Sequence, residues 1–169
     1  MQQRFKHNTA LLALLTGVGL ILGYVESIIF PQGMAYGIKL GISNIVVLFS
    51  LMCLGKSNAY IIAVVKSVLS GALFSSVSAI IYSLSGVLLS VALMSFLEKR
   101  FYPDRISVIG ISIAGSAAFN IGQVIVACFF TKTLFTIYVL THMLPISIIT
   151  GTVTGIITYL VLIRFKRGI

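Results

Sequence analysis

The chain has 169 residues, of which 59% are hydrophobic and only 9% are charged. Soluble domains carry about 25% charged residues, so this composition excludes a soluble enzyme, a secreted disulfide domain and a disordered tail. The formal net charge of +9 comes from lysines and arginines that separate apolar runs instead of forming one patch. That distribution argues against nucleic-acid binding and is typical of membrane proteins.

Apolar stretches of membrane-spanning length follow one another along the chain. A helix needs about 20 apolar residues to cross a bilayer, so a chain of 169 residues with loops has room for six. We therefore predict an all-α, polytopic membrane protein, a single integral domain over residues 1–169 built as a bundle of six transmembrane helices. The expected spans are about 10–30, 38–54, 59–74, 77–97, 106–130 and 146–163.

The first and last spans have distinctive boundaries. Arg4 and Lys6 precede the first span, but no small-residue cleavage site follows, so an uncleaved helix is expected instead of a signal peptide. The uncharged stretch from Leu134 to Ile163 is too long for one span. Because proline interrupts helices, Pro145 is expected to divide it into a short outer helix at about 134–143 and the sixth span.

Basic residues predict which way the bundle faces. With six spans, both termini and the loops at 55–58 and 98–105 share one side of the membrane. That side holds nine of the twelve Lys and Arg residues: Arg4, Lys6, Lys56, Lys99, Arg100, Arg105, Arg164, Lys166 and Arg167. Since basic loops remain in the cytoplasm, we expect a multi-pass protein of the cell membrane with both termini cytoplasmic.

Three charged side chains fall inside or at the edge of predicted spans. Lys66 lies deep in the third span, Glu26 in the outer third of the first, and Lys39 at the outer start of the second. A charge at mid-span costs at least about 2.5–3.5 kcal/mol and must face protein or a watery cavity. Either Glu26 pairs with Lys39 or Lys66 to hold the bundle together, or these groups line an outward-facing pocket for an anionic or strongly polar ligand.

Amide side chains make the same bundle more polar. Asn44 stands one turn past Gly37 and Gly41 in the second span, and Asn120 and Gln123 stand one turn apart in the fifth. Amides in a bilayer need hydrogen-bond partners, which either a neighbouring helix or a bound molecule supplies. The candidate substrate-binding residues are therefore Glu26, Lys39, Asn44, Lys66, Asn120 and Gln123.

Small residues mark one face of the first span. Ala10, Ala13 and Gly17 recur at spacings of three and four, which lets another helix approach closely. That helix belongs either to a partner subunit or to the bundle itself.

Several kinds of chemistry lack the residues that they need. The sequence has no GxxxxGK[ST] phosphate loop, and its one aspartate, Asp104, lies in a loop, so it offers neither a Ser–His–Asp set nor an aspartate-rich magnesium site. Cys53 and Cys128 lie in apolar stretches without metal-ligand spacing and are interpreted as small buried hydrophobes. We expect no catalysis by this chain, no metal and no cofactor.

Three motifs resemble a known family over about residues 10–163. The run from Gly37 to Asn44, the later Asn120–Gln123 and the Gly151 to Gly155 segment resemble the Gx transporter family, whose members are often labelled heptaprenyl diphosphate synthase component I. That family is similar in turn to the S components of energy-coupling factor (ECF) importers, six-helix subunits that bind vitamins. The family tends to have histidine before the later asparagine, where this chain has Phe119, so no role of that histidine is transferred.

The resemblance implies a substrate-binding subunit instead of an enzyme. Such a subunit captures a small molecule from outside and docks on a membrane T component driven by two cytoplasmic ATPases, with the small residues of the first helix, here Ala10, Ala13 and Gly17, as contacts. Two alternatives remain: a membrane accessory subunit of polyprenyl diphosphate synthesis that binds diphosphate through Lys39 and Lys66, and a scaffold in a membrane redox complex.

Overall fold

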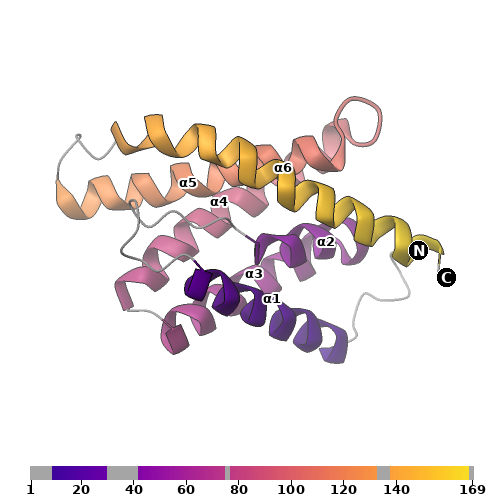
Figure 1. Cartoon of the computed structure of the whole chain (residues 1–169), viewed down its shortest axis with the longest axis horizontal. Coiled ribbons are helices and arrows are strands. Elements are labelled where there is room, and N and C mark those ends of the chain that lie inside the picture. The colour runs from indigo at the N-terminus through magenta and orange to yellow at the C-terminus, as the bar shows by residue number, and fades with distance from the viewer. Residues whose placement is uncertain (1–8, 30–41, 75–76, 133–137, 168–169) are drawn as a thin grey trace.

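The computed structural model of the chain is a bundle of helices (Figure 1) and describes residues 9–29, 42–74, 77–132 and 138–167. Its elements are α1 (Thr9–Ile29), α2 (Asn44–Leu54), α3 (Lys56–Phe74), α4 (Val77–Phe101), α5 (Val108–Thr131) and α6 (Tyr138–Arg167). Within these residues the only regular structure is helical, which confirms the predicted all-α class.

Five of the described helices, all except α2, are long and apolar enough to cross a membrane. With 11 residues, α2 is about 16 Å long, which is too short to cross a hydrocarbon core of about 30 Å. The predicted second span began at about residue 38, but residues 38–41 lie outside the described residues. The described chain therefore contains five helices of spanning length and a short sixth one.

The last helix differs from the prediction. Pro145 lies inside α6, which runs unbroken from Tyr138 to Arg167, so the expectation that Pro145 ends a separate outer helix is wrong. Proline removes only its own backbone N–H, and neighbouring hydroxyl groups compensate for such losses in membrane helices. The carbonyl that loses its donor is that of Thr141, four residues before Pro145, and α6 continues through this turn.

Successive helices alternate in direction, so α1 runs parallel to α3. Gly19 packs against Lys66, Gly23 against Ser70, and the rings of Tyr24 and Phe74 lie 4.9 Å apart. Both helices therefore finish at the end of the bundle where α2 and α4 begin, on the left in Figure 1.

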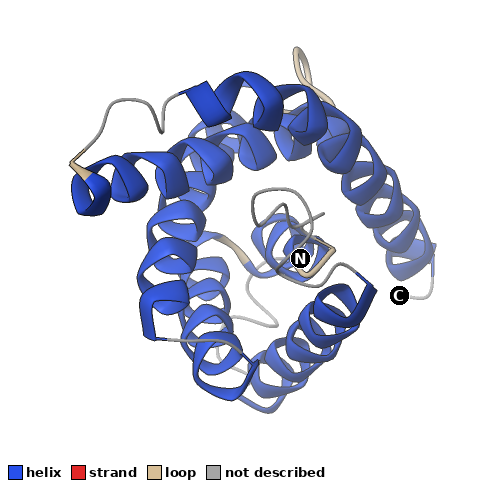
Figure 2. Ribbon diagram, turned by 60° about the vertical axis from the view of Figure 1, so that its left-hand side comes forward, coloured by secondary structure: helices blue, strands red, loops and turns tan. Residues whose placement is uncertain are grey.

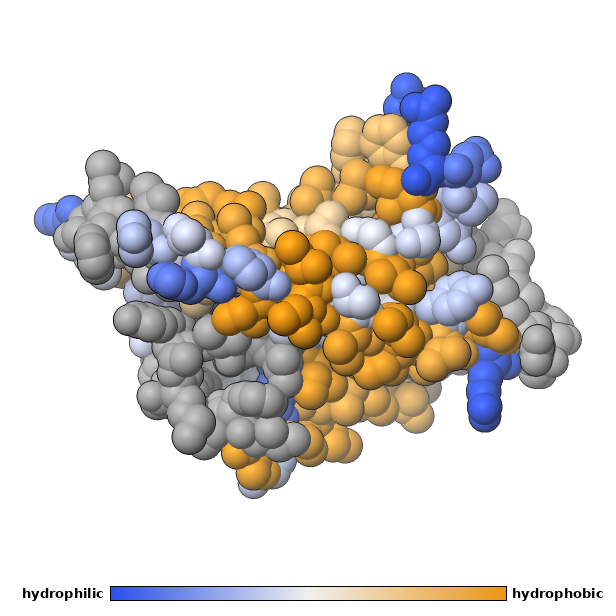
Figure 3. Space-filling model, turned by 45° about the horizontal axis from the view of Figure 1, so that its top comes forward, coloured by the Kyte–Doolittle hydropathy of each residue, from blue (hydrophilic) through white to orange (hydrophobic). Residues whose placement is uncertain are grey.

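The opposite end of the bundle, where α6 finishes, is called the basic end here. The described cations at this end lie on α3, on α4, in the loop before α5 and on α6: Lys56, Lys99, Arg100, Arg105, Arg164, Lys166 and Arg167. Between the two ends the surface is mainly apolar, as the orange band across the middle of Figure 3 shows.

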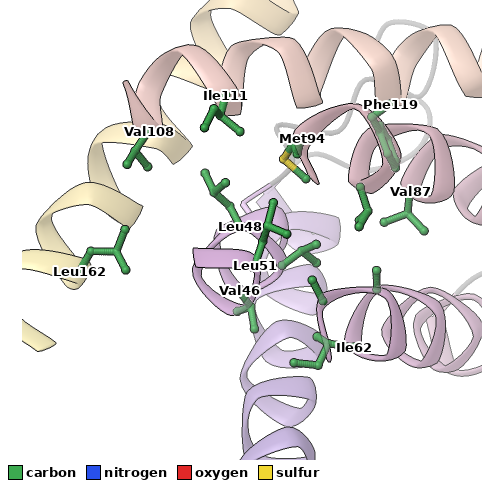
Figure 4. Packing of buried hydrophobic residues seen from close by; sticks show 14 residues of the cluster. Val46, Leu48, Leu51, Ile62, Val87, Met94, Val108, Ile111, Phe119 and Leu162 are labelled. Carbon is green, nitrogen blue, oxygen red and sulfur yellow. The ribbon is translucent and has the colours of Figure 1, made fainter. Parts of the chain in front are cut away.

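The centre of the bundle is α2. Seven of its eleven residues are buried: Ile45, Val46, Val47, Leu48, Ser50, Leu51 and Leu54. The long helices surround this centre in the view closer to end-on (Figure 2). In Figure 4, Leu48 and Leu51 lie between Ile111 of α5 and Ile62 of α3. A helix buried on nearly all sides is stabilised by packing, which explains why so short an element forms.

Glycines let α4, α5 and α6 approach one another closely. A Cβ on Gly122 of α5 would lie 2.7 Å from the carbonyl oxygen of Ser85 in α4, and one on Gly151 of α6 would lie 2.6 Å from Cα of Ile113. The hydroxyl groups of Ser112 and Thr154 are hydrogen-bonded across the α5–α6 contact at 2.8 Å. These three helices form a tightly packed layer beside α2, and α3 carries α1 on the other side of the bundle.

Candidate functional site

A polar pocket lies among five helices, in the half of the bundle away from the basic end. The space between its lining atoms, including its mouth, is about 470 Å³. The walls are Gly19, Gly23 and Glu26 of α1, Ser43 and Asn44 at the start of α2, Lys66, Ser67 and Ser70 of α3, Ser83 and Val87 of α4, and Phe119 of α5. Apart from two glycines, one valine and one phenylalanine, every one of these side chains is polar.

The base of the pocket is organised by Lys66. This side chain is only 5% exposed, and its ammonium group donates to the Ser43 carbonyl at 3.2 Å, to Ser43 Oγ at 3.0 Å and to Asn44 Oδ1 at 3.2 Å. All three acceptors belong to Ser43 and Asn44, so the ammonium is held against the start of α2. Gly19 makes room for the side chain, because a Cβ there would lie 3.1 Å from Lys66 Cδ.

The first turn of α2 adds to the positive potential at this point. Ser43 is the N-cap residue of α2, but its hydroxyl accepts from Lys66 and makes no capping bond to a backbone N–H. A helix N-terminus carries a partial positive charge, so a cation placed here is unfavourable unless anionic or acceptor groups lie nearby.

The carboxylate in the pocket belongs to Glu26, which is 3% exposed. Along α1 it lies three residues beyond Gly23, whose Cβ would lie 3.8 Å from Ser43 Cβ, so Glu26 is about one helical turn nearer the end of the bundle than Ser43 and the Lys66 ammonium that contacts it. The predicted partner Lys39 lies outside the described residues. Glu26 thus lies nearer the end of the bundle, and Lys66 nearer its middle.

Ser67 is a pocket residue that the sequence analysis missed. It is 1% exposed, and its Oγ has no hydrogen-bond partner within the described part of the chain. A buried hydroxyl without a partner is costly. A signal for it was present in the sequence, because Ser67 and Ser70 follow the buried Lys66 within about one helical turn.

The predicted site residues divide into two groups. The pocket brings together Glu26, Asn44 and Lys66, but its walls include neither Asn120 nor Gln123. Asn120 turns toward α6, where its Nδ2 donates to Ser147 Oγ at 2.6 Å. The side chain that α5 contributes is Phe119, one residue earlier.

A comparison with known protein families shows which family the chain belongs to. The sequence model of the heptaprenyl diphosphate synthase component I family matches residues 15–161. The chain belongs to this family. No curated protein and no solved structure matches the chain.

The matched region of the chain contains the whole pocket, whose lining residues run from Gly19 to Phe119. It begins after Ala10 and Ala13, two of the three predicted partner-binding residues. Both are exposed, and a Cβ added to the third, Gly17, would meet nothing within 4 Å. This face of α1 is therefore open to a neighbour.

The described residues contain no cluster of three or more His, Cys, Asp or Glu side chains that could hold a metal ion. The whole sequence has only three carboxylate side chains, Glu26, Glu98 and Asp104. Of these, Glu26 lies in the pocket, Glu98 near the end of α4 and Asp104 in the loop after it.

Proposed function

We propose that this protein is the substrate-binding membrane subunit, or S component, of an ECF-type importer. It captures a small, anionic, vitamin-like or isoprenoid- or quinone-related compound. The observation that carries the proposal is the pocket around Lys66, which is polar although it lies inside an apolar bundle. Charged groups at such depth are costly and are usually functional.

The position of the pocket supports capture from outside the cell. It lies in the half of the bundle opposite the basic end, and the positive-inside rule assigns a basic end to the cytoplasm. With both termini cytoplasmic, as proposed, Glu26 lies toward the outside and the α2–α3 turn toward the cytoplasm.

A T component and two cytoplasmic ATPases complete the proposed importer. The exposed Ala10 and Ala13 and the unfilled surface at Gly17 fit close approach by a helix of the T component, since small residues permit backbone contact in membranes. The chain itself carries no phosphate-binding loop for ATP, so energy comes from the partner subunits.

One alternative rests on the family's name: a membrane accessory subunit that supports heptaprenyl diphosphate synthesis by a partner. In that role the chain binds diphosphate and leaves the chemistry to the other subunit, since three carboxylates in different parts of the chain do not make a magnesium site. A scaffold role in a membrane redox complex is the third possibility, in which the buried charges serve only structure.

Native mass spectrometry of the protein purified in mild detergent tests the proposal. A retained small molecule and co-purified membrane and ATPase subunits are expected for an importer. The accessory role predicts instead that adding this protein changes the rate or product length of a soluble prenyl diphosphate synthase. If the purified protein retains no small molecule and no ATPase, and changes the rate or product length of the synthase, the importer proposal is wrong and the accessory role is favoured.

A further inference from the structure

The hydrogen bonds made by Lys66 determine what the base of the pocket offers to a ligand. Lysine is only a donor, so Asn44 must turn its Oδ1 toward Lys66 Nζ, and Ser43 uses a lone pair of its Oγ for the same ammonium. The Ser43 O–H and the Asn44 Nδ2–H groups remain as donors. Ser67 adds a third group, a buried hydroxyl with no partner in the described part of the chain.

We infer that Ser43, Asn44 and Ser67 form a wall of hydrogen-bond donors that binds an anionic oxygen group of the ligand, such as a carboxylate, sulfonate or phosphate. The inference rests on the proposed function and specifies the ligand chemistry of its site. An acceptor group satisfies the partnerless Ser67 hydroxyl, and its negative charge complements both the Lys66 ammonium and the N-terminus of α2. The positive N-terminus of α2 and the buried Ser67 hydroxyl are independent features of the same pocket, and both favour an anionic acceptor.

Lys66 is therefore a positioning residue. Its ammonium orients Ser43 and Asn44 so that their donors remain available, and it adds a positive charge behind them. Glu26 has the opposite charge and lies about one helical turn beyond Gly23, which is level with Ser43, so the anionic group of the ligand lies on the inner side of the pocket, away from Glu26.

Cysteine labelling tests the donor wall without knowledge of the natural ligand. In a Cys53→Ala, Cys128→Ala background, Ser67→Cys is treated with two methanethiosulfonate reagents, one bearing a sulfonate and one bearing a trimethylammonium group. Each rate is divided by the rate of the same reagent with a free thiol. We expect the sulfonate reagent to react faster by about tenfold or more, since positive potential beside the reacting thiol concentrates anions to this extent.

Two further variants separate the donor wall from simple attraction by charge. Ser43→Ala keeps Lys66 but removes a donor, so the sulfonate rate is expected to fall severalfold while the trimethylammonium rate does not change. Lys66→Met is expected to abolish the preference between the reagents. Ser50→Cys is the matched control, because Ser50 is also buried and partnerless within the described residues but lies outside the pocket; neither reagent should label it.

Clear results would overturn the inference. These are a preference for the trimethylammonium reagent, equal normalised rates, an unchanged sulfonate rate in Ser43→Ala, or labelling of Ser67→Cys no faster than of Ser50→Cys. Ser70→Cys, at a less buried position in the same pocket, checks whether reagent access alone limits labelling at position 67. If Ser70→Cys also reacts no faster with the sulfonate reagent than with the trimethylammonium reagent, the inference fails. The retained molecule and the partner subunits are measured separately, so the importer can stand even if the donor wall does not.

Discussion

Lys66 Nζ of α3 lies 3.0 Å from the Oγ of Ser43, and Ser43 is the residue that immediately precedes α2. The contact joins residues 23 positions apart in the sequence and fixes the start of the central helix to the wall of the pocket. A buried lysine thus links the packing of the bundle to the shape of its polar site.

Replacing this lysine should remove binding while preserving the fold. Lys66→Met has nearly the same length but no charge and no donors, so we expect retention of the co-purified small molecule to fall by about tenfold or more, which corresponds to about 1.4 kcal/mol. Quantitative native mass spectrometry measures it. Lys56→Met is the control, since Lys56 is exposed at the basic end over the ring of Tyr60. Equal loss of the retained molecule in both variants would show that Lys66 has no specific role in binding.

A methyl group beside Lys66 should have a related but smaller effect. In Gly19→Ala the new Cβ lies 3.1 Å from Lys66 Cδ, so the lysine must shift by a few tenths of an ångström. We expect retention to fall severalfold. Gly17→Ala, two residues away, meets nothing within 4 Å and should retain the molecule as the wild type does. The same Gly17→Ala protein can then be tested for loss of co-purified partner subunits, because position 17 lies on the proposed docking face.

The α4–α5 contact should tolerate no side chain at Gly122. A Cβ there would lie 2.7 Å from the Ser85 carbonyl oxygen and 2.9 Å from Gly86 Cα, both backbone atoms. Gly122→Ala is expected to destabilise the protein by about 1–3 kcal/mol, as overpacking does, and to lower the melting temperature in detergent. Gly23→Ala, whose Cβ would have ordinary contacts of 3.8 Å, should melt like the wild type. Equal melting of the two variants would contradict the close packing.

Asn120 should contribute to stability and not to binding. Its amide donates to Ser147 Oγ on α6, and hydrogen bonds of this kind in membrane proteins contribute about 0.6 kcal/mol on average and at most about 1.7 kcal/mol. Asn120→Ala should lower thermal stability by an amount in this range and leave retention of the small molecule unchanged. A double-mutant cycle with Ser147→Ala measures the coupling. Reduced retention in the single variant would return Asn120 to the ligand site.

The number and positions of the charged residues were better guides to this structure than the predicted helix boundaries were. The low charge content predicted the all-α bundle, and the cost of burying Glu26 and Lys66 predicted a shared polar site, because both effects depend on composition and depth alone. Pro145 misled because a single missing N–H does not end a helix that is packed over its length. The short α2 was not predictable either, since its stability comes from neighbours on nearly every side.

The side chains of the site were only partly predictable for a similar reason. Asn120 and Phe119 are adjacent in sequence but face α6 and the pocket respectively, and which of the two turns inward depends on how α5 is rotated. The partnerless hydroxyl of Ser67 is visible only once the neighbouring helices are in place.

The way α1 is held makes the site sensitive to the surrounding lipid. Large apolar side chains of α1 are turned away from the rest of the bundle: Leu14, Val18, Ile21, Val25 and Ile28. Acyl chains are as apolar as these side chains, so hydrophobicity alone does not keep the helix docked on α3. Bilayer thickness and the choice of detergent should therefore change how firmly α1 packs against α3 as a wall of the pocket. The fraction of protein that retains the small molecule should be higher in nanodiscs than in short-chain detergent micelles.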